Sequence, residues 1–165
     1  MKDAIGLLAR AITGGVWVVA GWLKFQDPAA TVRDVRAFRM LPEAVVPTFG
    51  HLLPILELVL GACLLLGLLT RFTGVASTLL LTAFVIGIAA AWARGLEIRC
   101  GCFGGGGLSA DPVPGYIRDI ARDVGLILLS VWLVWRPITP FSLDRILFRP
   151  TERLDDVDER SAVQN

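Results

Sequence analysis

The chain has 165 residues, of which 55% are hydrophobic and only 19% are charged, and its mean hydropathy is +0.65. This composition lies outside the range of soluble domains and indicates an integral membrane protein. The net charge of +1, with acidic residues interleaved among the basic ones, excludes a nucleic-acid-binding surface, which needs a concentrated basic excess.

Four apolar segments approach the roughly 20 residues that a helix needs to cross a bilayer. They cover about residues 4–24, 46–69, 72–93 and 116–135. We therefore predict an all-α, polytopic membrane protein built as a four-transmembrane-helix bundle, with the lipid bilayer as its first partner.

The four segments differ in how many charged residues and prolines interrupt their apolar sequence. The first is interrupted by Arg10 and lacks a small-residue cleavage site, so we expect a retained span rather than a signal peptide. The second contains Pro54, which predicts a helix kinked or begun near that residue. The third has no charged residue, whereas "RDIARD" occupies the opening turns of the fourth. The arginines of the first and fourth segments can snorkel toward headgroups.

A short amphipathic helix is predicted between the first two spans, in "QDPAATVRDVRAFRMLPEAVVP". Apolar and basic residues there recur at helical spacing on separate faces, which is typical of an interfacial helix. The apolar positions are Val32, Val35, Phe38 and Leu41, and the basic positions are Arg33, Arg36 and Arg39.

Four spans place both chain ends on one side of a cell membrane, and the two-residue link "TR" between the second and third spans forces an antiparallel hairpin. Lysines and arginines divide equally between the two sides. Discounting the arginines of the amphipathic helix and of the fourth span favours cytoplasmic termini. The domain is then residues 1–140, and residues 141–165 form a polar, disordered cytoplasmic tail.

Two of the three cysteines lie one residue apart in "EIRCGCFGGGG". The α-carbons of Cys100 and Cys102 are at most about 7 Å apart, so a disulfide between them requires the backbone to bend at Gly101. Such a bridge is strained and readily reduced, and closing so short a loop adds little stability. Arg99 favours a reactive thiolate at its neighbour. We therefore interpret the pair as a disulfide-exchange site facing the extracytoplasmic side, where disulfides persist.

Metal binding is the chemical alternative. Two thiolates are too few for a closed zinc site, but Cu(I) held by the cysteine pair together with Met40 or His51 stays open. Cys63 lies about 24 Å below the loop by helical rise, so it cannot reach the pair and reads as a buried apolar residue.

Glu57 is an acid inside an apolar segment and needs a partner. Lys24, Arg118 and Arg122 are the candidates, all toward the side of the CGC loop. One interpretation is an ion pair that locks the first, second and fourth spans together. The other makes Glu57 a proton acceptor coupled to thiol oxidation.

These features together resemble the MauE/DoxX group of four-helix membrane proteins over residues 4–140. The resemblance rests on "GGVWVVAGWLKFQDP", "LPILELVLGACLLLG", "AWARGLEIRCGCFG" and the "RD" repeats of the fourth span. Similarity to MauE implies methylamine utilisation and maturation of the disulfide-rich small subunit of methylamine dehydrogenase. Similarity to DoxX implies quinone-linked sulfur or thiol oxidation.

Three functions stay open. The first is a thiol–disulfide oxidoreductase in which Cys100 and Cys102 exchange disulfides with a thioredoxin-like or secreted partner. With one cysteine pair, such a protein needs a second redox protein or a quinone to take up the electrons. The second is a non-catalytic subunit that docks a redox enzyme, and the third is Cu(I) handling. The sequence does not predict an oligomeric state.

Overall fold

The structure, a computed structural model, describes residues 2–99, 101, 107–108 and 113–135. The elements in chain order are α1 (Lys2–Gln26), α2 (Pro28–Ala37), α3 (Val46–Leu66), α4 (Thr70–Ala93), β1 (Ile98–Arg99), β2 (Gly107–Leu108) and α5 (Val113–Trp135). The predicted all-α class is confirmed for this part of the chain, where the two strands contribute only two residues each. The expected tail at residues 141–165 lies outside the described residues.

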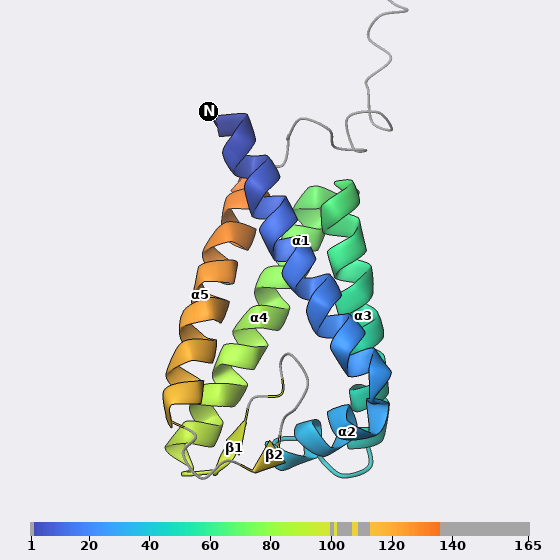
Figure 1. Cartoon of the computed structure of the whole chain (residues 1–165), viewed down its shortest axis with the longest axis vertical. Helices are drawn as coiled ribbons and strands as arrows, with labels where there is room; N and C mark the ends of the chain where they lie inside the picture. Colours follow the sequence, from blue (N-terminus) through green and yellow to red (C-terminus); the bar gives the residue numbers. More distant parts are fainter. Residues whose placement is uncertain (1, 100, 102–106, 109–112, 136–165) are drawn as a thin grey trace, which may run out of the picture.

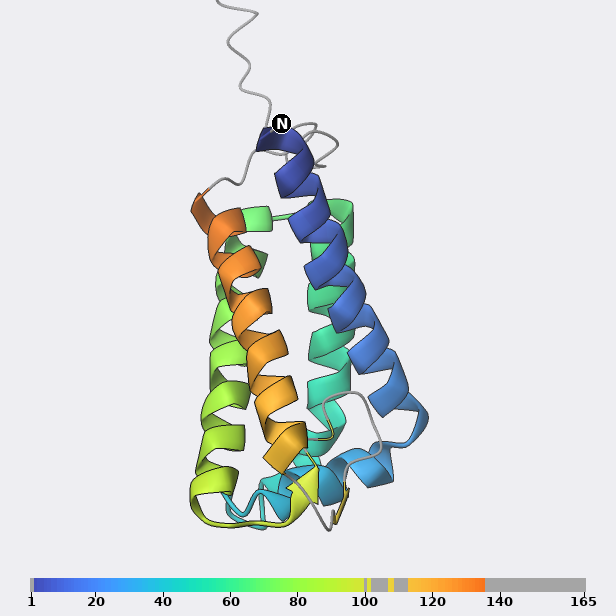
Figure 2. The same cartoon turned by 60° about the vertical axis from the view of Figure 1, so that its left-hand side comes forward.

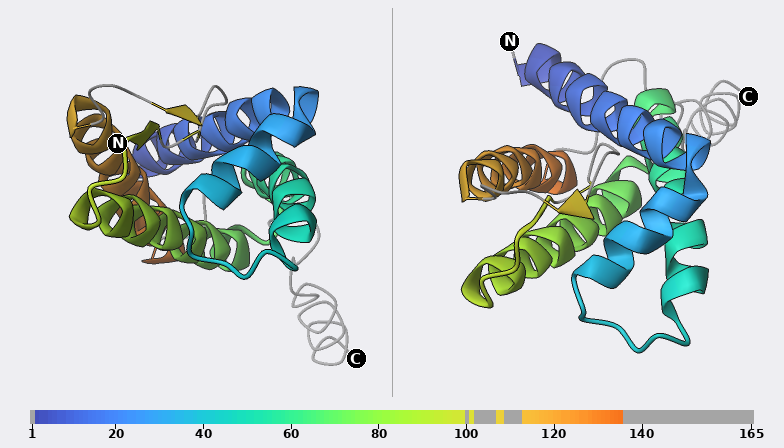
Figure 3. Two further views of the ribbon diagram at one scale, coloured as in Figure 1. Left: turned by 90° about the horizontal axis from the view of Figure 1, so that it is seen from below. Right: turned by 60° about the horizontal axis from the view of Figure 1, so that its bottom comes forward.

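The four long helices run alternately up and down, and α2 crosses one end of the bundle (Figures 1 and 2). Seen from that end, α2 spans the space between α3 and the other helices (Figure 3). The two strands lie at the same end as α2, opposite the N-terminus (Figure 1). The molecule therefore has a terminal end and a hairpin end.

Three of the described helices are long and apolar enough to cross a membrane, over Ile5–Gln26, Val46–Leu66 and Thr70–Ala93. Many of their large apolar side chains face outward, as in Phe72 at 75% exposed and Leu79 at 66%, which suits a lipid environment. The predicted fourth span, α5, is not among the three, so the count of four is not confirmed. Its opening turns carry four charged residues, Arg118, Asp119, Arg122 and Asp123.

The bundle consists of two closely packed helix pairs, because α1 makes its main contacts with α3 and α4 makes its main contacts with α5. Glycines bring α1 and α3 together: a β-carbon on Gly14 would lie 3.1 Å from the carbonyl oxygen of Gly61. Small residues allow this close approach of membrane helices. Contacts between the two pairs are fewer.

Trp17 stands at the junction of the two pairs. Its side chain is 2% exposed and belongs to the main apolar core. The indole Nε1 donates a hydrogen bond of 2.7 Å to Ser77 Oγ on α4, and Ser77 Oγ lies 3.1 Å from Ser130 Oγ on α5. A buried polar chain thus connects α1, α4 and α5.

The side chain of Arg10 is buried against the C-terminal end of α3. It is 2% exposed, and its guanidinium donates to the carbonyl oxygens of Leu64 and Leu65, each at 3.0 Å. These carbonyls belong to the last turn of α3, where backbone donors become scarce; the Leu64 carbonyl oxygen also accepts from the Gly67 N–H at 3.1 Å. Gly67 ends the helix with φ +66° and packs against the guanidinium.

Two local predictions need correction. The helix α3 does not begin near Pro54, because it runs from Val46 to Leu66 with Pro54 inside it. The link between α3 and α4 is residues 67–69, whereas the predicted "TR" link already belongs to α4. The antiparallel order of the two helices is as predicted (Figure 1).

The predicted amphipathic helix is present as α2, but its apolar side faces the protein. Val32 packs against Gly50 of α3, where even a β-carbon would collide with it. Thr31 and Asp34 are buried, and Thr31 Oγ1 donates to the carbonyl oxygen of Lys24 at 3.3 Å. The helix therefore closes the hairpin end of the bundle.

The helix α2 is also shorter than its sequence pattern. It ends at Ala37 with Phe38 as C-cap, so Arg39 and Leu41 do not continue its two faces. Arg39 has φ +48°, a left-handed conformation that a helix cannot contain. The carbonyl oxygens of Phe38 and Arg39 accept hydrogen bonds from Arg94, which fastens this turn to the end of α4.

Candidate functional site

The segment that carries the CGC motif leaves and rejoins the bundle through a short antiparallel ladder. Ile98 pairs with Leu108, and Arg99 pairs with Gly107. Gly107, the last glycine of the run that follows the motif, is thus part of this ladder. Cys100 and Cys102 lie outside the described residues, as does the side chain of Arg99.

Tyr116 attaches this ladder to α5. Its side chain is 1% exposed, its hydroxyl donates to the carbonyl oxygen of Leu96 at 2.6 Å, and it accepts a hydrogen bond from the Ile98 N–H at 3.4 Å. A buried tyrosine normally finds such a partner for its hydroxyl. The base of the CGC hairpin is therefore held at a defined position on the bundle.

Gly101, the central residue of the motif, lies against the side chain of Asp34. It has φ +67°, a conformation that residues with a β-carbon rarely adopt. A β-carbon there would also collide with the Asp34 carboxylate. Asp34 is 9% exposed, so glycine is required here both for its backbone conformation and for the space it leaves.

A cavity of about 220 Å³ lies beneath Gly101. Lys24, Thr31 and Asp34 provide its polar wall, and most of the remaining surface is apolar. Three aromatic rings line it, from Phe38, Phe49 and Phe84. Cavities of this kind, apolar with a few convergent polar groups, are the usual form of a small-molecule site.

The cavity reaches the surface of the protein at the hairpin end, between α3 and α4. Met40, Leu41 and Phe49 line it and are between 38% and 49% exposed. Because Phe49 belongs to an apolar candidate span, this opening is flanked by apolar residues.

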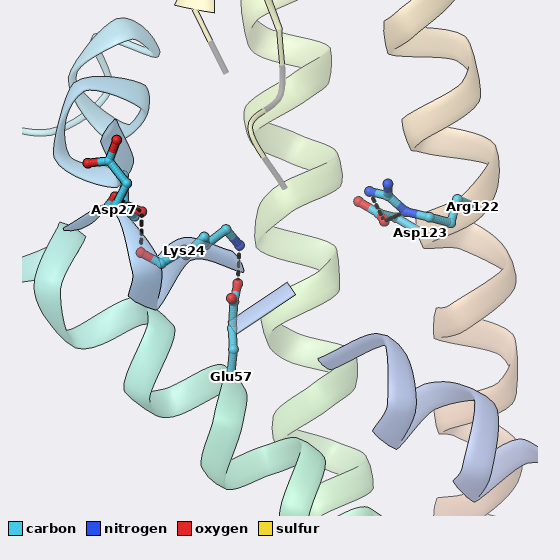
Figure 4. A network of polar contacts seen from close by, with 6 residues as sticks. Lys24, Asp27, Glu57, Arg122 and Asp123 are labelled. Atoms are coloured by element: carbon cyan, nitrogen blue, oxygen red, sulfur yellow. Dashed lines mark hydrogen bonds and ion pairs between the residues drawn. The ribbon is translucent and has the colours of Figure 1, made fainter. Parts of the chain in front are cut away.

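Glu57 pairs with Lys24, one of the three partners predicted from the sequence. The two side chains point toward each other from α3 and α1 (Figure 4), and Lys24 Nζ donates to Glu57 Oε1. The side chain of Glu57 is 0% exposed, and that of Lys24 is 5% exposed. Lys24 Nζ also lies 5.3 Å from the centre of the Phe84 ring, within range of a cation–π interaction.

Arg122 does not pair with Glu57 but with two acids of its own helix. It lies 3.1 Å from Asp119 Oδ1 and 2.8 Å from Asp123 Oδ1. The ion pair of Glu57 thus joins the first two predicted spans, and the expected direct link to the fourth span is not made. Arg118 is exposed on α5.

The two charged pairs nevertheless face a common space. A second cavity of about 20 Å³ is lined by Glu57, Arg122 and Asp123. Glu57 Oε2 and Asp123 Oδ2 are buried and have no hydrogen-bond partner among the described residues. The volume exceeds the roughly 10–15 Å³ that one water needs. A water there can hydrogen-bond to a carboxylate that lines the cavity.

Two residues of the Cu(I) alternative, Met40 and His51, lie within the described part of the chain. Met40 lines the large cavity together with Gly101. The ring Nδ1 of His51 is 2.6 Å from the carbonyl oxygen of Pro47 on an exposed part of α3. Cys63 lies near the other end of α3, one turn before Gly67. Within the described ranges, no group of three or more His, Cys, Asp or Glu residues is arranged to hold a metal.

Asp34 is the site residue that the sequence analysis missed. It follows Thr31 by three residues and precedes Phe38 by four, so the three share one helical face. The alignment of Asp34 with the apolar Phe38 on one helical face was a signal that Asp34 is buried. Asp123 was noticed only as part of "RDIARD", without its orientation toward Glu57.

Comparison with known proteins gives one family. The family model described as methylamine utilisation protein MauE matches residues 2–136, which include every helix and strand described above. No curated protein and no solved structure matches the chain.

Proposed function

The chain belongs to the MauE family, and on that basis we propose that it exchanges disulfides through Cys100 and Cys102 with a thioredoxin-like or secreted partner. Family membership and the apolar helices make it a membrane protein associated with methylamine utilisation. The proposed substrate class is a protein whose cysteines must be paired during maturation, as in the small subunit of methylamine dehydrogenase.

The exchange conserves atoms and electrons. A thiolate of one cysteine attacks a disulfide sulfur, a mixed disulfide forms, and the displaced sulfur leaves as a thiolate. The second cysteine then attacks the mixed bond and releases the partner. One dithiol is oxidised while the other disulfide is reduced, and the two protons pass from the first pair of thiols to the second.

The position of Gly101 is the observation that carries the proposal. A glycine at φ +67° packed on buried Asp34 supports a fixed bend at Gly101, between the two cysteines. The Tyr116 anchor supports the same interpretation. A fixed bend favours a cysteine pair that can close into a strained, exchangeable ring.

The topology completes the proposal: four spans, cytoplasmic termini and an extracytoplasmic CGC loop. The charge pairing of α5 supports its role as the fourth span, since Arg122 is neutralised by Asp119 and Asp123 within the helix. A helix of 23 residues reaches about 35 Å. Labelling of the cysteines in intact cells with an impermeant thiol reagent after mild reduction tests the orientation.

Trapping of mixed disulfides tests the exchange itself. A Cys102→Ser or Cys100→Ser variant is expressed in cells and its disulfide-linked partners are isolated under non-reducing conditions. One of the two variants is expected to accumulate a mixed disulfide with a thioredoxin-like or secreted protein, and the double serine variant is expected to trap nothing. If neither single variant traps a partner and both wild-type thiols are always free to alkylation, the exchange does not occur.

Two other functions make different predictions in the same experiments. A docking subunit keeps the full activity of its complex when both cysteines are changed to serine. Cu(I) handling draws support from Met40, which lines the same cavity as Gly101. It predicts one Cu(I) per chain and loss of that binding in either cysteine variant.

A further inference from the structure

The cavity beneath Gly101 has features that the exchange of disulfides between proteins does not use. Its polar wall is buried inside the bundle, at Lys24 and Asp34, and its opening is lined by apolar residues at the edge of a candidate span. Protein partners dock on surfaces, whereas an internal cavity with a lateral apolar opening suits a small, lipid-soluble molecule.

We propose that this cavity binds the ring of a lipid-soluble quinone, which takes up the electrons when Cys100 and Cys102 become a disulfide. This inference rests on the proposed exchange function for its redox step, but the binding site itself is defined by Lys24, Asp34, Phe38, Phe84 and Gly87.

The size of the cavity agrees with one substituted six-membered ring. A dry cavity of about 150 Å³ holds benzene, and this one measures about 220 Å³. Phe38, Phe49 and Phe84 offer aromatic faces for stacking against a flat ring. An isoprenoid tail can leave through the opening beside Met40 and Leu41, whose side chains are half exposed.

Lys24 provides the polar recognition. An ammonium group carries three N–H donors, and Glu57 Oε1 accepts one of them. The remaining donors are available to a quinone oxygen, and the positive charge becomes more favourable as that oxygen gains electron density during reduction. The contact with Glu57 orients the Lys24 ammonium, which is only 5% exposed.

Gly101 places the cavity beside the proposed redox pair, because it is covalently joined to both cysteines and is itself part of the cavity wall. The redox step balances: two thiols lose two electrons and two protons to form the S–S bond, and the quinone gains both to become the quinol. The single cysteine pair then needs no second redox protein as its electron acceptor.

Gly87 offers a way to fill the cavity without touching the charged residues. A β-carbon there would lie 3.9 Å from Met40 Sδ and from the Phe38 ring, at ordinary contact distance. A leucine at this position extends into the space reserved for the ring. Gly125 on α5 is a matched control, since it is also a helical glycine and a β-carbon there has no neighbour within 4 Å.

The test is photolabelling in nanodiscs of quinone-free phospholipid with a short-chain azido-benzoquinone, competed by decylubiquinone. Labelled peptides are expected from α3 and α4. We expect Gly87→Leu to reduce the competed labelling at least about tenfold, which corresponds to 1.4 kcal/mol of binding free energy, and Gly125→Leu to leave it unchanged. If the leucine variant fails to fold, Gly87→Ala replaces it, because alanine fits without collision. The expected loss of labelling in Gly87→Ala is smaller.

Binding and redox chemistry are measured separately. Labelling is repeated with Cys100→Ser/Cys102→Ser, which is expected to bind the quinone as the wild type does. Reduced wild-type protein is then mixed with decylubiquinone, and one quinol is expected for each dithiol that becomes protected from alkylation.

The outcomes distinguish the two proposals. Equal labelling of Gly87→Leu and Gly125→Leu, or a phospholipid seen by native mass spectrometry that decylubiquinone does not displace, overturns the quinone site while mixed-disulfide trapping still stands. Competed labelling in the absence of any trapped partner retains the quinone site and overturns the exchange function.

Discussion

The helix α1 buries two cations, Arg10 toward the terminal end of the bundle and Lys24 toward the hairpin end, and the two are used differently. Arg10 donates to backbone carbonyls in the last turn of α3 and packs against Gly67. Lys24 pairs with a carboxylate and lines a cavity of about 220 Å³. Burial of a charge is costly at both positions, so burial alone does not identify a functional residue.

The partner and the adjacent space make the difference. The backbone carbonyls beside Arg10 cannot change their charge, and the guanidinium fills the space beside them. Glu57 can change its charge, and its second oxygen faces a cavity large enough for one water. We therefore assign a structural role to the cation at the terminal end and a binding role to the cation at the hairpin end.

The largest expected effect comes from breaking the pair at the hairpin end. Glu57→Gln leaves Lys24 buried without a counter-charge, and we expect a loss of about 3–5 kcal/mol in the free energy of unfolding. Steric-trapping measurements in bicelles provide that free energy. The double variant Lys24→Met/Glu57→Gln removes both charges and should lose much less. A single variant as stable as the wild type would contradict a buried, charged pair.

At the terminal end, Arg10→Met should cost about 1.5–3 kcal/mol, the range for hydrogen bonds to a charged group. Arg10→Lys should recover only part of this, because an ammonium lacks the planar fork that reaches Leu64 and Leu65 together. Quinone photolabelling corrected for the folded fraction should not change. A loss of labelling in folded Arg10→Met would remove the distinction between the two ends.

The third prediction concerns the hairpin end alone and compares two glycines of similar conformation. Gly101 has φ +67° and Gly95 has φ +63°, so alanine at either position costs about 1–2 kcal/mol of backbone strain. Only at Gly101 does the new β-carbon collide, against Asp34; Gly95 has no neighbour within 4 Å. The strain and the collision together disfavour the native position of the motif in Gly101→Ala. We therefore expect mixed-disulfide trapping to fall about tenfold or more, the factor to which 1.4 kcal/mol corresponds.

Equal trapping in Gly101→Ala and Gly95→Ala, measured at matched amounts of folded protein, would show that the contact with Asp34 does not position the motif.

The smallest effect is expected midway between the two ends. Trp17→Phe removes the hydrogen bond to Ser77 Oγ but keeps an aromatic ring near Phe84, so we expect a loss of about 0.5–1.5 kcal/mol. Trp22→Phe is the control, because Trp22 is 55% exposed and should cost less. Thermal unfolding in detergent is sufficient for this comparison. Equal losses would argue against the buried polar chain that joins the helix pairs.

Part of this site can be predicted from sequence because its signals are local. An acid such as Glu57 inside an apolar segment requires a partner wherever the segment packs, and Lys24 was among the candidates. Choosing it over Arg122 required the structure: Arg122 is satisfied by Asp119 and Asp123 one turn or less away on the same helix, whereas Lys24 reaches Glu57 across the α1–α3 contact.

The hairpin could not be predicted for a related reason. Two strands of two residues each have no periodic pattern, and their pairing depends on the Tyr116 hydroxyl, 18 residues after Ile98. The glycine run gives no local signal for a strand, because glycine permits almost any conformation. The tertiary contact with Tyr116 selects one of them for the described part of the segment.

Local patterns were sufficient to predict the apolar helices, the amphipathic helix that follows the first of them, the family, and the need for a partner at Glu57, because hydrophobic periodicity and composition act over neighbouring residues. Four features required the three-dimensional structure: how the helices pair, that α2 turns its apolar side inward, that Arg10 caps α3, and that Gly101 rests on Asp34 above a cavity. Each of these features depends on contacts between residues that lie dozens of positions apart in the chain. Local patterns are compatible with several such arrangements, and packing and the pairing of buried polar groups select one of them.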